Sequence, residues 1–114
     1  MNPDTRYKSL IWVKMLKTPT KTLVDTGAEA SGISLNMFHA NPQLKHYVTD
    51  HKPATCVSVN KQTVRTVGSV VVPFHIGGKV FHHKFFVVED LIHPVVLGLD
   101  FLKKKQFSTS TMTN

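Results

Sequence analysis

The segment LVDTGA, residues 23–28, carries the strongest structural signal in this 114-residue sequence. It completes the run KTLVD (21–25), whose apolar and β-branched residues predict a β-strand. Gly27 follows soon after Asp25, and glycine gives the backbone the freedom that a tight loop needs. The segment therefore predicts that Asp25 ends a strand, where a loop can present its carboxylate for binding or catalysis.

The residues on either side of this segment predict further short strands. The run SLIWVKML (9–16) is rich in strand formers, and the Thr-Pro-Thr sequence at 18–20 is expected to break it before the run that leads to Asp25. These two runs predict a first hairpin. Residues 32–35 then predict a short strand, and residues 36–44 predict a loop or a short turn of helix.

A projecting hairpin is predicted in the middle of the chain. The runs ATCVSV (54–59) and QTVRTV (62–67) both have strand composition. Asn60-Lys61 lies between them and can turn the chain back on itself, because asparagine tolerates the left-handed backbone conformation of tight turns.

The clearest local pattern is a long hairpin that follows. Val70, Val72, Phe74 and Ile76 alternate with their neighbours, Gly77-Gly78 forms a turn sequence, and KVFHHKFFVV (79–88) supplies the returning strand. The run VVLGLDFL (95–102) is almost wholly apolar, so it predicts a buried strand that leads into a short helix over residues 101–105.

Length and composition favour one domain spanning residues 1–114. The chain is 41% hydrophobic and shows neither a repeat nor a linker, so we expect a core of about residues 8–106 and a flexible tail at 108–114. The predicted elements add up to a mostly β, largely antiparallel fold with one short C-terminal helix. Such a chain is short for an enzyme that encloses a peptide between two lobes, which favours self-association.

Composition also excludes several classes of protein. Cys56 is the single cysteine and cannot form an internal disulfide, and no apolar run approaches the roughly 20 residues that span a bilayer. Residues 1–8 are polar and lack the apolar stretch of a secretory signal, so we expect no membrane association and a chain that is intracellular or cut from a larger precursor. The 14 Lys and Arg against 7 Asp and Glu give a net charge of +7, but these residues are scattered and lack an aromatic stacking pattern. We favour a solvated basic surface over specific nucleic-acid binding.

Two of these segments together resemble a known family. LVDTGA resembles the active-site signature of aspartic proteases, and VVLGLDFL resembles an apolar segment with glycine found late in retropepsins, the proteases of retroviruses and long-terminal-repeat retrotransposons. An Asp-Thr-Gly triplet alone is common, but its position, the intervening hairpin and the late segment make the match specific. The resemblance covers about residues 10–105.

The resemblance implies a closed, β-barrel-like retropepsin (acid protease) fold with a flap hairpin and one short C-terminal helix. Pepsin-like enzymes carry two signatures in a longer chain, whereas this chain carries one, so a homodimer is needed to bring two copies of Asp25 together. The pair would share one proton and activate a water, without a metal or another cofactor. The implied substrates are extended peptide segments of a Gag-Pol-type polyprotein, from which the enzyme is itself released inside a cell or a virus-like particle.

The resemblance also assigns roles to individual residues. Asp25 is the catalytic acid, and the substrate-binding and active-site loop contains Thr26, Gly27, Ala28 and Glu29. The flap tip falls on Val59, Asn60, Lys61 and Gln62, and structural support falls on Gly98 and Asp100. The family usually has aspartate where Glu29 stands and often arginine where Leu99 stands, and its flap tip is usually richer in glycine than this one.

These residues also admit roles other than catalysis. Asp25 alone could be a turn aspartate, and Asp100 could cap a helix while also supporting the site. His82 and His83 are adjacent on a strand and point to opposite faces, so we expect exposed strand histidines and no metal site. Cys56 has no accompanying motif and receives no catalytic role. The alternative function is a catalytically weak or inactive dimerisation or peptide-binding module with the retropepsin fold.

Overall fold

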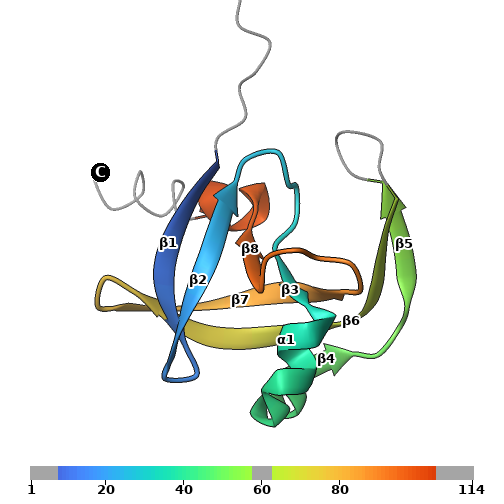
Figure 1. The fold of residues 1–114 in the computed structure, drawn as a ribbon, viewed down its shortest axis with the longest axis horizontal. Coiled ribbons are helices and arrows are strands. Elements are labelled where there is room, and N and C mark those ends of the chain that lie inside the picture. Colours follow the sequence, from blue (N-terminus) through green and yellow to red (C-terminus); the bar gives the residue numbers. More distant parts are fainter. Residues whose placement is uncertain (1–7, 58–62, 105–114) are drawn as a thin grey trace, which may run out of the picture.

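The computed structural model describes residues 8–57 and 63–104, which form a closed arrangement of strands with short helical segments at its edges (Figure 1). The predicted flap tip at 59–62 and the tail at 108–114 lie outside these residues. The elements in chain order are β1 (Lys8–Met15), β2 (Thr18–Asp25), β3 (Gly32–Ser34), α1 (Leu35–Ala40), the 3-10 helix η1 (Pro42–Tyr47), β4 (Val48–Asp50), β5 (Ala54–Val57), β6 (Thr63–Ile76), β7 (Lys79–Val88) and β8 (Val95–Leu97).

The strands close into a barrel. Hydrogen-bonded neighbours follow the order β1-β2-β8-β3-β7-β6, and β1 pairs again with β6 through Lys14↔His75 and Met15↔Phe74. The β2–β8 and β3–β7 pairs are parallel, while the remaining pairs are antiparallel. β4 and β5 add to the other parts of β6. The predicted mostly β, closed barrel-like fold is therefore confirmed.

The first hairpin is confirmed, but its turn lies earlier than predicted. Leu16 and Lys17 form the turn with φ values of 50° and 69°, and Met15 pairs with Thr18. The expected break at 18–20 is wrong, because Pro19 is part of β2 opposite Lys14. Positive φ at both turn residues matches the twist of the strands, although neither leucine nor lysine announces such a turn in the sequence.

The long β6–β7 hairpin forms as its alternation predicts. Gly77 and Gly78 occupy the turn with φ values of 55° and 85°, and Ile76 pairs with Lys79. One face of the hairpin supplies fully buried side chains, among them Phe74 and Phe85, whose rings meet edge to face at 5.5 Å. Burial of these rings makes the hairpin the main wall of the core.

Helical segments cover the ends of the barrel. Residues 99–104 form the predicted short C-terminal helix, and the buried ring of Phe101 packs against Phe74 and Phe81 at 5.4 and 5.3 Å. Residues 36–44, for which the sequence predicts either a loop or a short turn of helix, contain most of α1. The first turn of α1 is capped by Ser34, whose Oγ accepts a 3.0 Å hydrogen bond from the Met37 N–H. No helix within the described residues has the length and apolarity needed to cross a membrane.

Candidate active site

Asp25 ends β2 and opens a loop that its own carboxylate helps to shape. Oδ1 of Asp25 accepts a 2.8 Å hydrogen bond from the Gly27 N–H, and the Asp25 carbonyl accepts one of 3.1 Å from the Ala28 N–H. The side chain is half-buried, so the carboxylate is held in place yet reachable. We call residues 25–31 the Asp25 loop.

The Asp25 loop is bonded to a segment that lies about 70 residues later in the chain. This Gly98 segment, residues 98–101, follows β8, and β8 pairs in parallel with the last part of β2. The Leu99 N–H donates a 2.8 Å hydrogen bond to the Ala28 carbonyl, and the Asp100 N–H donates one of 3.0 Å to the Glu29 carbonyl. The two segments thus form a short ladder directly behind the catalytic candidate.

Gly98 is needed for this close approach. A Cβ atom added at Gly98 would stand 2.6 Å from the Ala28 carbonyl oxygen and 2.8 Å from that of Ala30. Both distances are shorter than real Cβ contacts, and both partners are backbone atoms that cannot move aside without shifting the loop. Any other residue at 98 would therefore push the Asp25 loop away from the Gly98 segment.

The Asp100 carboxylate gathers the hydrogen bonds that fix the loop. Ser31 donates to it twice, from its N–H to Oδ2 at 3.0 Å and from its hydroxyl to Oδ1 at 2.7 Å. The Phe101 N–H donates to Oδ1 at 2.7 Å, and the Ser31 hydroxyl accepts a 3.0 Å hydrogen bond from the Gly98 N–H. Because Ser31 is fully buried, these bonds replace the solvation that its polar groups lose.

His83 completes this polar cluster, contrary to the prediction of an exposed strand histidine. Its Nε2 lies 3.0 Å from Oδ2 of Asp100, and the residue is only 7% exposed. The imidazole stands edge-on to the rings of Phe85 and Phe101 at 5.7 and 5.3 Å. Nε2 lacks the alignment of a regular hydrogen bond with any described residue, although it stands this close to the Asp100 carboxylate.

The sequence did contain a signal for the burial of His83. Side chains alternate between the two faces of a strand, so His83 shares a face with Phe85 and Val87, which are buried. His82 points to the other face and is exposed, as predicted. Both histidines are polar, which favours exposure of both, but the alternation of β7 buries His83 and exposes His82.

The surroundings of Asp100 keep its carboxylate ionised. Partial burial acts to raise the pKa of Asp100, but the contact with His83 and the bonds from Ser31 act in the opposite direction and outweigh it. The pKa of Asp100 is therefore lowered from its ordinary value of 3.8. At Asp100 the cluster thus holds a fixed negative charge.

The structure brings most of the predicted site residues together. The Asp25 loop contains Asp25, Thr26, Gly27, Ala28 and Glu29, and the Gly98 segment places Gly98 and Asp100 against it. Val59, Asn60, Lys61 and Gln62 lie outside the described residues, although β5 and β6 pair on both sides of them, with Val57 opposite Thr63. Within residues 8–57 and 63–104, no three side chains of His, Cys, Asp or Glu converge to hold a metal ion.

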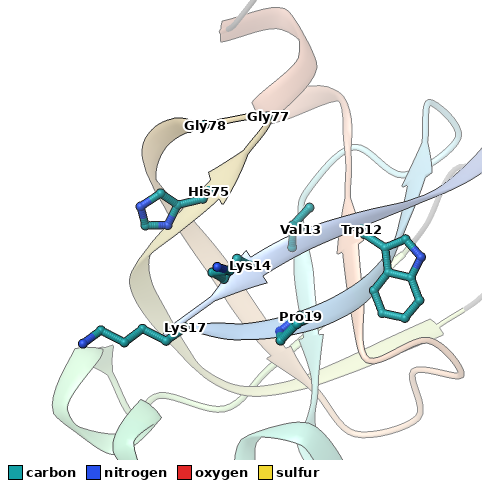
Figure 2. Close-up of a pocket in the computed structure, with 8 residues that line it drawn as sticks. All are labelled: Trp12, Val13, Lys14, Lys17, Pro19, His75, Gly77 and Gly78. Atoms are coloured by element: carbon teal, nitrogen blue, oxygen red, sulfur yellow. The ribbon is translucent and has the colours of Figure 1, made fainter.

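A hollow lies away from this site, along the β1–β2 hairpin and the β6–β7 turn (Figure 2). It measures about 700 Å³, and its lining contains no carboxylate. The residues around it are Trp12, Val13, Lys14, Lys17, Pro19, His75, Gly77 and Gly78. Because it includes none of the acids of the Asp25 loop, this hollow does not belong to the candidate active site.

Comparison with solved structures identifies the fold. The retroviral protease-like domain of Ddi1 from Leishmania major superimposes with a TM-score of 0.69 at 22% identity, over 87% of this chain and 78% of that chain. EIAV protease complexed with the inhibitor HBY-793 gives 0.64 at 23%, over 93% of both chains. A retropepsin-like aspartic protease from Rickettsia conorii gives 0.56 at 20%, over 90% and 73%. The chain therefore has the retropepsin-like fold.

Comparison at the level of sequence gives the family. No curated protein sequence matches the chain. The model of a protein family described as "gag-polyprotein putative aspartyl protease" matches residues 11–104, a range that includes both the Asp25 loop and the Gly98 segment. With most of its length matched and its strands closed in the retropepsin-like manner, this chain belongs to the gag-polyprotein aspartyl protease family.

Proposed function

We propose that the protein is a homodimeric aspartic endopeptidase that cleaves extended peptide segments. The observation that carries the proposal is the placement of Asp25, which ends β2, is half-buried and is held by the Gly27 N–H within a loop that the Gly98 segment supports. Each chain offers one Asp-Thr-Gly sequence, so two chains are needed to supply two carboxylates. EIAV protease, whose fold is shared over 93% of both chains, supports the choice of chemistry.

In this proposal, two copies of Asp25 face each other across a two-fold axis. Two carboxylates held close cannot both ionise at low cost, so they share one proton. The ionised member takes a proton from a water between them, and the protonated member polarises the scissile carbonyl as the water attacks. The chain's own Asp25 carboxylates thus supply both the base and the acid.

Substrate would bind as an extended strand over the Asp25 loop. Gly27 lets the backbone of the peptide approach, while Ala28 and Glu29 line the neighbouring subsites. The hairpin formed by β5 and β6 would serve as the flap, its tip falling on residues 59–62. We further propose that the natural substrate is a Gag-Pol-type polyprotein from which the protease is released, inside a cell or a virus-like particle, because the family is that of gag-polyprotein proteases.

The deciding experiment compares cleavage of a mixed peptide library by the wild type, Asp25→Asn and Asp50→Asn at several protein concentrations. Asp50→Asn is the matched control, because it makes the same chemical change on β4 and keeps the oxygen that accepts the Lys52 N–H. We expect wild-type activity to rise more steeply than linearly with concentration, Asp25→Asn to be inactive and Asp50→Asn to match the wild type.

Two results would count against the proposal. Cleavage that survives Asp25→Asn would remove the aspartic mechanism. Absence of cleavage by folded wild type at high concentration would favour the alternative of a dimerisation or peptide-binding module with the same fold.

A further inference from the structure

We propose that His83 is a positioning residue for the reaction, which holds the Asp25 loop in register through Asp100 and does so in a proton-dependent way. The inference rests on the proposed function for its effect on catalysis, but its structural part can be tested without any activity.

A continuous path leads from His83 to the residues beside the catalytic candidate. Nε2 of His83 lies 3.0 Å from Oδ2 of Asp100, and the same oxygen accepts the Ser31 N–H at 3.0 Å. The Asp100 N–H in turn donates to the Glu29 carbonyl at 3.0 Å. A displacement of the Asp100 carboxylate therefore acts directly on Ser31 at the end of the Asp25 loop, while the backbone of Asp100 holds Glu29 in the same loop.

β7 also contacts the loop a second time. The Phe86 N–H donates a 3.0 Å hydrogen bond to the Ser31 carbonyl, while β3, which follows the loop, pairs with β7 through Gly32↔Phe86. His83 lies three residues before Phe86 on β7, so β7 contacts Ser31 through the Phe86 backbone and, by way of Asp100, through the His83 side chain. The Asp25 loop is thus held both by a hydrogen bond to its backbone and by hydrogen bonds to the Ser31 side chain.

The surroundings of His83 leave it one charged partner among the described residues. On β6 its register partner is Val72, and the neighbouring rings are those of Phe85 and Phe101. On its own strand, His82 and Lys84 are exposed on the opposite face. Glu29 and Lys103 line a hollow together with Leu99 and Asp100. Of these groups, only Asp100 reaches the imidazole.

The contact is sensitive to the charge of His83. Nε2 lies 3.0 Å from Oδ2 of Asp100, and a protonated imidazole adds an attraction between opposite charges to this contact. Asp100 itself stays ionised, since its pKa is lowered. When His83 loses its proton, the pull on Oδ2 of Asp100 weakens while the bonds from Ser31 remain. We expect the Asp25 loop to loosen at that point.

The first test follows this coupling by NMR in the 114-residue chain that carries Asp25→Asn, in which the Asp25 pair cannot titrate. We would record the His83 imidazole resonances and the amide resonances of Ser31 and Gly98 from about pH 4 to 8, the range in which histidines change charge. The expected result is that both amides shift with the midpoint of His83. The same shifts should vanish when His83→Gln is added. They should persist when His82→Gln is added, because that substitution makes the same chemical change on the exposed face of β7.

The second test measures catalysis by otherwise wild-type protein. We expect His83→Gln to lower kcat/KM roughly tenfold, mainly through kcat, because small displacements of a catalytic group are costly. His82→Gln should stay within about twofold of the wild type, as exposed substitutions away from a site usually do. The kcat/KM profile of His83→Gln should also lack the inflection that has the midpoint of His83.

The outcomes separate this inference from the proposed function. Amides of Ser31 and Gly98 that do not follow the His83 midpoint would overturn it, and this result needs no variant at position 83 to fold. Equal pH profiles for folded His83→Gln and wild type would overturn its catalytic part. Cleavage that survives Asp25→Asn would instead refute the aspartic mechanism. The coupling between His83 and the loop would then still be decided by the NMR titration.

Discussion

The β6–β7 hairpin and the Asp25 loop are stabilised in opposite ways. The hairpin joins neighbours in the sequence through a regular register, and its inner face buries apolar side chains such as Phe74 and Phe85. The Asp25 loop is held by polar contacts with the Gly98 segment, which is distant in the sequence. Ser31 and Asp100, for example, are 69 residues apart. Most of the core burial and the precise geometry of the site therefore come from separate parts of this barrel.

Removal of a ring from the hairpin should have the largest effect on stability. Phe74→Ala leaves a cavity among Phe81, Phe85 and Phe101, and we expect it to lower the free energy of unfolding by about 3–5 kcal/mol. Val80→Ala, on the exposed face of β7, should cost less than about 1 kcal/mol. Urea denaturation of both variants measures the difference, and similar losses would contradict the assignment of the core.

Gly98→Ala should break the other region by steric conflict. The added Cβ would meet the carbonyl oxygens of Ala28 and Ala30, so we expect a loss of about 2–4 kcal/mol and a loss of cleavage by any protein that remains folded. The control is Gly77→Asn at the hairpin turn, where φ is 55° and the space is open. Asparagine tolerates that conformation, so this change should cost under about 1 kcal/mol. Folded, fully active Gly98→Ala protein would show that the close approach is not needed.

Asp100→Asn should weaken the polar region in a manner that depends on pH. Its charge supports the bonds from Ser31 and the contact with His83, and with a side chain about a third exposed we expect a loss of about 1–2 kcal/mol near neutral pH. Because the pKa of Asp100 is lowered in the folded state, its contribution is present above the ordinary value of 3.8 and is lost as pH falls through the lowered pKa.

The gap between wild type and Asp100→Asn should therefore close in strong acid. Denaturation at a series of pH values measures it, with Asp50→Asn on β4 as the control for loss of one negative charge outside the cluster. A gap that stays constant as the pH falls below 3.8 would mean that the charge of Asp100 does not contribute.

The two regions also differ in how far the sequence could predict them. The hairpin was predicted closely because alternation and the Gly77-Gly78 turn are local signals. Asp25 and its loop were predicted from a local strand and a motif. The contacts of Ser31 and His83 with Asp100 could not be predicted, because they depend on how β3, β7 and the Gly98 segment meet in three dimensions.

The first hairpin turn shows the same limit on a smaller scale. Pro19 suggested a break, and the actual turn at Leu16-Lys17 has no favoured turn residue to mark it. The core contact of Leu16 helps to explain why a residue that is unfavourable locally is kept there. Tertiary packing has overridden local preference at this position.

Lys17→Gly should give the smallest effect and test that explanation. Lys17 is exposed at φ 69°, a conformation that costs an L-residue about 1–2 kcal/mol and glycine nothing. The greater conformational freedom of glycine in the unfolded chain lowers the free energy of unfolding by roughly 0.5–1 kcal/mol. We therefore expect a net stabilisation of about 0.5 kcal/mol. Lys17→Ala removes the same charged side chain but keeps the strain, so it should not stabilise the protein. Equal melting temperatures for Lys17→Gly and Lys17→Ala would place the cost of this turn elsewhere than in its backbone conformation.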